Sequence, residues 1–76
     1  MTEYTIYCRG LKLSAREEPT GWSWVIDGPD EKNVAIATNE TSAKSACINV
    51  AKARLRRDGV PIPDSLNEPQ WKSNTV

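Results

Sequence analysis

The chain has 76 residues, enough for one small domain that buries about 60% of its unfolded surface. It contains no Phe, so its three Trp and two Tyr must supply most of the large buried side chains. It also contains no His and only two well-separated Cys, which excludes the usual zinc sites, and we expect neither a metal nor a cofactor. Ten basic residues balance ten acidic ones, so the chain as a whole is neither strongly basic nor strongly acidic.

The compartment is suggested by what the sequence lacks. The first residues do not have the basic and apolar regions of a secretory signal, and no apolar run approaches the roughly 20 residues that span a membrane. We therefore expect a cytoplasmic protein without a membrane partner, in which Cys8 and Cys47 are reduced and packed as small apolar side chains.

The first predicted strand covers residues 4–9, where Tyr4, Ile6 and Cys8 alternate with polar or exposed positions. After Gly10 the apolar positions shift to Leu11 and Leu13. A bulge at the glycine would explain this change of face, so we expect a bulge or a bend at Gly10. Residues 14–20 are polar and contain a proline, so we expect a loop or a wide hairpin connection there.

A β-hairpin is predicted over residues 21–38. Its first strand, residues 21–27, places Trp22, Trp24 and Ile26 on one face, and its second strand covers residues 34–38. The residues between them, 28–33, are rich in turn formers, so the two strands should pair in antiparallel fashion.

One helix is predicted over residues 43–55, capped by Thr41 or Asn39 and ending before Gly59. Its apolar face consists mostly of small residues, which allows close packing on a sheet that supplies the tryptophans. The predicted architecture is α+β: a three-stranded antiparallel sheet with one helix packed on one face (β-β-β-α). Residues 1–66 would form this single domain, and residues 67–76 an extended, flexible C-terminal tail.

The sequence offers no recognisable catalytic group. Histidine is absent, the four glycines are isolated at positions 10, 21, 28 and 59, and neither cysteine has an activating neighbour in sequence. We therefore expect a protein that is not an enzyme and has no small-molecule substrate.

The sheet face away from the helix is the first candidate for a partner-binding site. A single helix covers one face only, so the other face would expose Tyr7, Arg9, Ser23 and Val25. Such a face can bind a second copy of the chain or another protein. The alternative is that Ile62 or Trp71 folds over these residues, which would then be ordinary surface positions.

The end of the helix suggests a second candidate, a nucleic-acid contact made by Lys52, Arg54, Arg56 and Arg57. The alternative is that these cations stabilise the helix C-terminus, where the macrodipole attracts positive charge in any protein.

Two stretches resemble known families. Residues 22–26, 34–40 and 42–46, together with Val50, resemble one unit of the small YegP-like family. Residues 57–63, Arg-Asp-Gly-Val-Pro-Ile-Pro, are similar to the close of HicB-like antitoxin domains. Both resemblances imply a β-β-β-α unit that associates with a protein, either another such unit or a different partner, and neither implies a catalytic residue.

Overall fold

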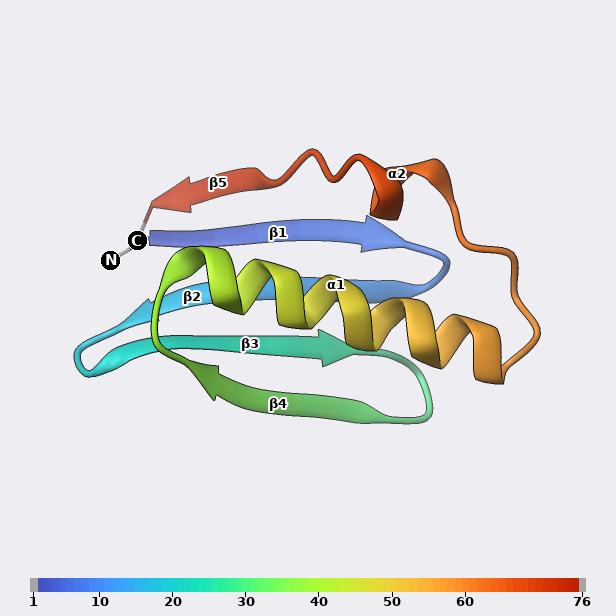
Figure 1. Ribbon diagram of the computed structural model, residues 1–76, viewed down its shortest axis with the longest axis horizontal. Coiled ribbons are helices and arrows are strands. Elements are labelled where there is room, and N and C mark those ends of the chain that lie inside the picture. The colour runs from blue at the N-terminus through green and yellow to red at the C-terminus, as the bar shows by residue number, and fades with distance from the viewer. Residues whose placement is uncertain (1, 76) are drawn as a thin grey trace.

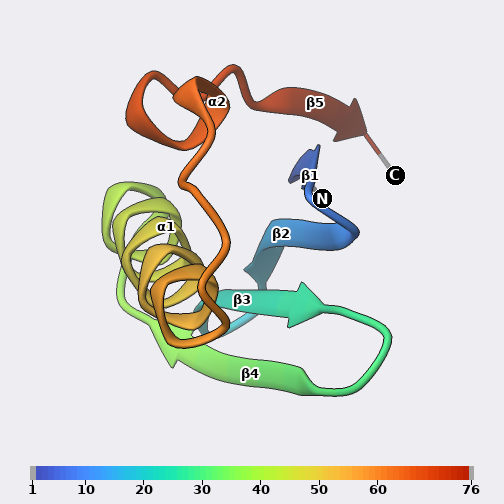
Figure 2. The ribbon, with the colours of Figure 1, turned by 90° about the vertical axis from the view of Figure 1, so that its right-hand side faces the viewer.

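The computed structural model describes residues 2–75, which form one antiparallel sheet and two helices. The elements are β1 (Thr2–Cys8), β2 (Leu11–Glu18), β3 (Gly21–Asp27), β4 (Lys32–Ala37), α1 (Glu40–Arg57), α2 (Asp64–Asn67) and β5 (Lys72–Thr75). The five strands lie in the order β4-β3-β2-β1-β5, and every neighbouring pair is antiparallel (Figure 1). Helix α1 packs on one face of this sheet, and within residues 2–75 no element covers the other face (Figure 2).

The fold is α+β as expected, but the three-stranded sheet is wrong, and the first reason lies at Arg9 and Gly10. These residues are not a bulge. Both have positive φ, 48° and 79°, as in the type I′ turn that joins two strands of a hairpin. The chain therefore reverses here, and Cys8 pairs with Leu11 on the same face of the sheet. This reversal, rather than an inserted residue, accounts for the shift in the apolar positions.

The second reason is that residues 14–18, expected to belong to a loop or a wide hairpin connection, continue β2. Leu13 and Ala15 are fully buried, while Ser14 and Arg16 lie on the opposite face. The inward side chain at position 15 is only a methyl group, so the alternation of a strand is weak in the sequence. The hairpin connection between β2 and β3 is just Pro19 and Thr20.

The third reason is the C-terminal segment. The residues expected to form an extended tail include β5, which pairs with β1 from Thr2 opposite Thr75 to Thr5 opposite Lys72. Before β5, the short helix α2 buries Leu66 in the core. The C-terminal segment is therefore part of the sheet, and its polar strand β5 lies at one edge.

The predicted hairpin of β3 and β4 is confirmed. Trp24 pairs with Ala35 and Trp22 with Ala37. The indole of Trp24 is 7% exposed, and that of Trp22 is partly buried against the core. The large rings on β3 are thus matched by small side chains on β4, which lets α1 approach the sheet closely.

Helix α1 begins and ends largely where the sequence indicates. The side chain of Asn39 accepts a hydrogen bond of 2.8 Å from the backbone N–H of Ser42, and this is the N-cap. At the other end Gly59 has φ of 72°, and its N–H and that of Val60 donate to the carbonyls of Arg56 and Leu55, a Schellman motif. Of the helices in residues 2–75, neither is long and apolar enough to cross a membrane.

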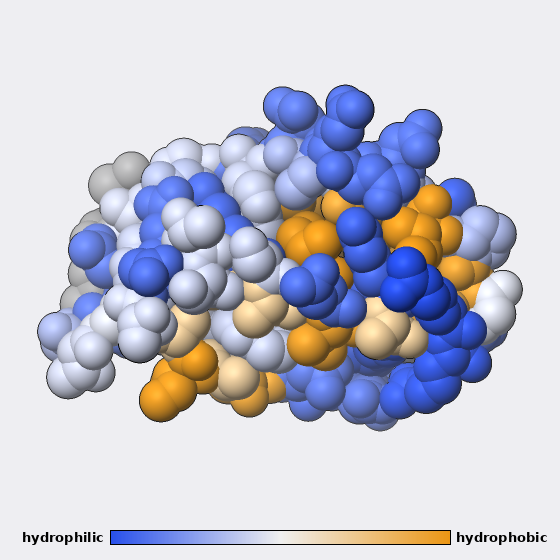
Figure 3. Space-filling model, viewed as in Figure 1, coloured by the Kyte–Doolittle hydropathy of each residue, from blue (hydrophilic) through white to orange (hydrophobic). Residues whose placement is uncertain are grey.

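The helix-bearing side of the molecule also holds the C-terminal segment in place. The ammonium group of Lys44 lies 3.6 Å from the ring centre of Tyr4 and 5.9 Å from that of Trp71, and it forms a 2.9 Å ion pair with Glu40. Much of this side is hydrophilic, with apolar patches toward the end where α1 finishes (Figure 3).

Candidate partner-binding surface

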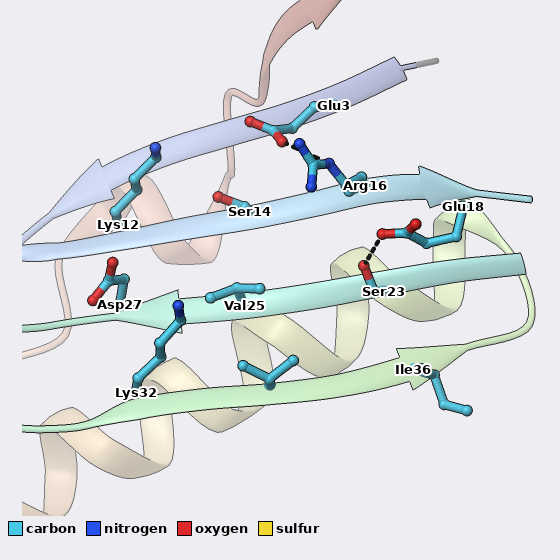
Figure 4. Close-up of a pocket in the computed structure, with 11 residues that line it drawn as sticks. Glu3, Lys12, Ser14, Arg16, Glu18, Ser23, Val25, Asp27, Lys32 and Ile36 are labelled. Carbon is cyan, nitrogen blue, oxygen red and sulfur yellow. Dashed lines mark hydrogen bonds and ion pairs between the residues drawn. The ribbon is translucent and has the colours of Figure 1, made fainter. Parts of the chain in front are cut away.

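The side of the sheet opposite α1, which we call the open face, is a shallow hollow of about 490 Å³. It is lined by alternate residues of β1 to β4, all of which point away from the core (Figure 4). The lining residues are Glu3, Lys12, Ser14, Arg16, Glu18, Ser23, Val25, Asp27, Lys32, Val34 and Ile36.

Charges on the open face are matched across neighbouring strands. Glu3 of β1 lies opposite Arg16 of β2, and their side chains form an ion pair of 3.2 Å (Figure 4). Next to it, the hydroxyl of Ser23 donates a hydrogen bond of 3.0 Å to the carboxylate of Glu18. The polar groups at this end of the face already have partners within the chain.

The other end of the open face carries a row of alternating charge. Asp27 on β3 lies between Lys12 on β2 and Lys32 on β4 in the strand register. Together with Glu3, Glu18 and Arg16 at the first end, these residues line the hollow with three acidic and three basic side chains. A surface with this balance has no net preference for an anionic or a cationic ligand.

Apolar side chains lie between the two charged ends and extend to the outer strand. Val25 on β3 is half-buried and pairs with Val34 on β4. Val34 is 62% exposed and Ile36 is 88% exposed. Ile36 points away from the other lining residues, beyond the body of the sheet (Figure 4). An isoleucine in this position loses most of the free energy that burial would give it.

The two edges of the sheet differ in chemistry. Strand β5, at one edge, is polar in sequence: Lys-Ser-Asn-Thr. Strand β4, at the other edge, reads Lys-Asn-Val-Ala-Ile-Ala. We call Lys32–Ala37 the β4 edge. After Lys32 it carries no charge and no proline, the residues with which proteins commonly protect an edge strand from pairing.

The four residues predicted for the sheet site do not all lie together. Ser23 and Val25 line the hollow. Tyr7 is 72% exposed on the same face, and Lys12 lies 6.0 Å from its ring centre. Arg9 lies in the turn between β1 and β2 and is not part of the face.

The C-terminal segment does not cover the open face. Trp71 lies beside Lys44 and Ile48 of α1, where it helps to line a hollow of about 260 Å³ on the helix side. Ile62 packs against the main core. The alternative in which Ile62 or Trp71 shields the sheet residues is therefore not the arrangement in the structure.

The four basic residues of the second candidate site are divided between different environments. Arg54 is 7% exposed, and its guanidinium donates a hydrogen bond of 3.3 Å to the side-chain oxygen of Asn33. Lys52 is half-buried beside the hollow that contains Trp71, and Arg56 is exposed.

Arg57 is the fourth of these residues. It forms ion pairs of 3.2 Å with both Asp58 and Glu31. The hydrogen bond to Asp58, followed by that to Glu31, raises the pKa of Arg57, and the hydrogen bond from Arg57 lowers the pKa of the Glu31 carboxyl. Two of the four arginines and lysines are thus engaged within the chain.

The two thiols lie in apolar surroundings. Burial raises the pKa of Cys47 from 9.0 to about 12, and burial also raises the pKa of the half-buried Cys8. The thiol of Cys47 lies 3.8 Å from the backbone oxygen of Val25, to which it donates weakly. Both groups are therefore held as neutral thiols near pH 7, where a thiolate would be needed for nucleophilic attack.

Sequence reasoning missed two exposed apolar side chains of the open face, Val34 and Ile36. The sequence predicts a strand over residues 34–38, but the sheet order is needed to place that strand at an edge. A useful signal is present in the sequence. Val34 and Ile36 are large, whereas Ala35 and Ala37, on the other face of the same strand, are small.

Comparison with known proteins found no match: no family model, no curated protein and no solved structure matches this chain. The YegP-like and HicB-like resemblances therefore stay predictions.

Proposed function

We propose that this protein is a small binding domain that associates with another polypeptide through the β4 edge and the adjoining part of the open face. The observation that carries the proposal is the exposure of Val34 and Ile36 on a strand whose outer side has no neighbour among residues 2–75. An added strand would satisfy the outward N–H and C=O groups of β4 and bury both side chains.

The contrast between the two edges supports this proposal. If exposed apolar residues were merely tolerated, they would be scattered over the surface. Among residues 2–75, two of the three large exposed apolar side chains are instead on β4. Strand β5 has none in its described side chains.

A non-catalytic role fits the groups that line the open face. Its acids and bases occupy ordinary exposed or ion-paired positions, and the chain has no histidine to act as a base near pH 7. The neutral, buried Cys47 is a poor nucleophile.

Binding of nucleic acid by the helix end remains the alternative. The engagement of Arg54 with Asn33, and of Arg57 with Glu31 and Asp58, leaves less positive charge for phosphate groups than the sequence suggests. We therefore favour a polypeptide partner. Salt-sensitive binding of DNA or RNA that falls on Lys52→Ala, Arg56→Ala double substitution would reverse this preference.

The proposal is tested by photo-crosslinking in cells from one position on each edge. A photoreactive amino acid replaces Ile36 on the β4 edge or, as a matched control, Lys72 on the β5 edge. We expect a covalent adduct of one discrete mass from position 36 and none from position 72. The adduct should disappear when Val34→Glu is added, because the new charge would enter the contact.

Equal labelling from both positions would contradict the proposal, because it would indicate random collision. So would the absence of any adduct from position 36 when the variant protein is folded and abundant.

A further inference from the structure

We infer that the polypeptide bound at the β4 edge is a second copy of this chain, paired strand to strand about a two-fold axis that passes beside Ala35. The inference rests on the proposed function and specifies its partner. It follows from the register that β4 can adopt with itself.

The first step excludes stacking of two open faces. The hollow contains six charged side chains, and face-to-face packing of two copies would take twelve charges out of water. Burying charges costs several kcal/mol each unless every one is well paired, and several of these are paired only at the surface. Pairing at the β4 edge leaves all of them exposed.

The second step limits the possible registers. In an antiparallel pair, directly opposite residues share a face of the sheet. Val34 and Ile36 lie on the open face, and Ala35 lies on the helix face opposite Trp24. A continuous sheet therefore allows a residue of β4 to stand opposite itself, as at position 34, 35 or 36, but not opposite its sequence neighbour.

The third step selects one of these three registers. When Ala35 lies opposite the second copy's Ala35, Val34 of each copy lies opposite Ile36 of the other. All five residues 33–37 of each copy are then paired. With Val34 opposite itself, each Lys32 would stand against an isoleucine. With Ile36 opposite itself, only residues 35–37 pair within the strand, because α1 begins at Glu40.

Charge is compatible with the register centred on Ala35. Glu31, which precedes β4, and Lys32, its first residue, fall opposite the second copy's Asn39 and Thr38, which are neutral. No like charges therefore face one another along the paired strands. On the helix face, Ala35 and Ala37 are small and only partly buried against the core, and the contacts of α1 lie mainly with β2 and β3.

The size of this contact predicts a reversible dimer. The five paired residues extend over about 17 Å, and such an interface falls below about 1,200 Å² in total, the range of weak and transient complexes. Each copy also has its own buried core, including Leu13, Trp24 and Ile26, so association is not needed for folding.

The first test is sedimentation velocity of the purified protein over a concentration series from micromolar to millimolar. We expect a monomer–dimer equilibrium that Ile36→Lys weakens at least tenfold. Tyr7→Lys is the matched control, because Tyr7 is also a strongly exposed apolar residue on the open face but lies on β1. Equal weakening by both substitutions would mean that open faces stack, and would overturn the inference.

The second test fixes the register by single cysteines in a Cys8→Ser background. Opposite residues of an antiparallel pair have Cα atoms about 4.5–5.5 Å apart, within disulfide range. Under mild oxidation Ala35→Cys alone should give a disulfide-linked dimer. Val34→Cys and Ile36→Cys should each fail alone and crosslink when mixed. A dimer from Val34→Cys alone or Ile36→Cys alone would overturn the proposed register.

The outcomes separate this inference from the proposed function. A purified protein that stays monomeric at millimolar concentration overturns the second copy as partner. The proposed function would still stand if photo-crosslinking from position 36 yielded an adduct with a different protein.

Discussion

The side-chain amide of Asn74 donates a hydrogen bond of 3.0 Å to the hydroxyl oxygen of Thr5, and this bond links the last strand to the first. Thr5 is buried on the strand that pairs with β5, so its hydroxyl depends on this partner. We expect Asn74→Ala to lower the free energy of unfolding by about 0.5–1.5 kcal/mol, the usual net value of one such bond.

Urea unfolding followed by tryptophan fluorescence measures this loss. Lys72→Ala is the control, because Lys72 is exposed on the same strand and should change the stability by less than about 0.5 kcal/mol. Equal losses for the two variants would mean that strand pairing alone, and not the Asn74 side chain, holds β5.

Trp24 lies at the centre of the core, where its ring is flanked by β2, β4 and α1. Trp24→Ala should destabilise the domain by about 3–5 kcal/mol, because it removes a large buried ring and leaves a cavity. Ile36→Ala is the control in dilute solution. Because Ile36 is almost fully exposed, this substitution should change the free energy of unfolding far less. A loss below about 1 kcal/mol for Trp24→Ala would be inconsistent with the packing described.

The turn at Arg9 and Gly10 predicts one substitution that lowers the stability of the fold and one that raises it. A methyl group at position 10 would meet nothing within 4 Å, so Gly10→Ala should destabilise through the backbone alone, by about 1–2 kcal/mol for a residue with positive φ. Arg9→Asn should stabilise the fold, because asparagine tolerates positive φ better than arginine does. Thermal unfolding of the two variants should therefore shift in opposite directions, and shifts of the same sign would argue against this turn.

The buried Cys47 makes stability depend on alkaline pH. Burial raises its pKa from 9.0 to about 12, so in the unfolded chain the thiol ionises at lower pH than in the folded chain. The stabilising contribution is complete below about pH 9 and is lost as the pH rises from there toward 12.

Because tyrosines and lysines also titrate in this range, the measurement is the difference between wild type and Cys47→Ala. The free energy of unfolding of the wild type should fall more steeply with pH above 9 than that of the variant. Parallel curves would show that the thiol is not shielded from solvent.

Arg54 and Arg56 should respond differently to truncation. Arg54→Ala removes a buried side chain and leaves Asn33 without its guanidinium partner, so we expect a loss of about 1–3 kcal/mol. Arg56→Ala, at an exposed position, should stay within about 0.5 kcal/mol. Chemical denaturation of both variants measures the free energy of unfolding. If Arg54→Ala left it unchanged, Arg54 would be only a surface cation.

The hairpin of β3 and β4 and the helix could be predicted because each has a local cause. Alternation placed Trp22 and Trp24 on one face, and the Asn39 cap and Gly59 marked the ends of α1. These signals arise from residues close together in the chain, so no knowledge of the sheet was needed.

The remaining strands could not be predicted for equally specific reasons. Arg9-Gly10 forms a turn for which Asn-Gly is the more common sequence, and Ala15 gives little hydrophobic signal. Strand β5 is polar, so only its pairing with β1 makes it a strand. The candidate site depended on the sheet order, because a sequence does not state which strand lies at an edge.

The pairing of Thr2 with Thr75 brings the two ends of the described chain together at one edge of the sheet. A short linker would therefore close the polypeptide into a ring without changing any strand neighbour. Such a ring could be reopened between β3 and β4, in the turn at residues 28–31, and the same sheet would then form from a chain with a different start. The order of the strands along the chain can thus be changed while their order in the sheet is kept. Folding of such a permuted chain would show which of these two orders directs folding.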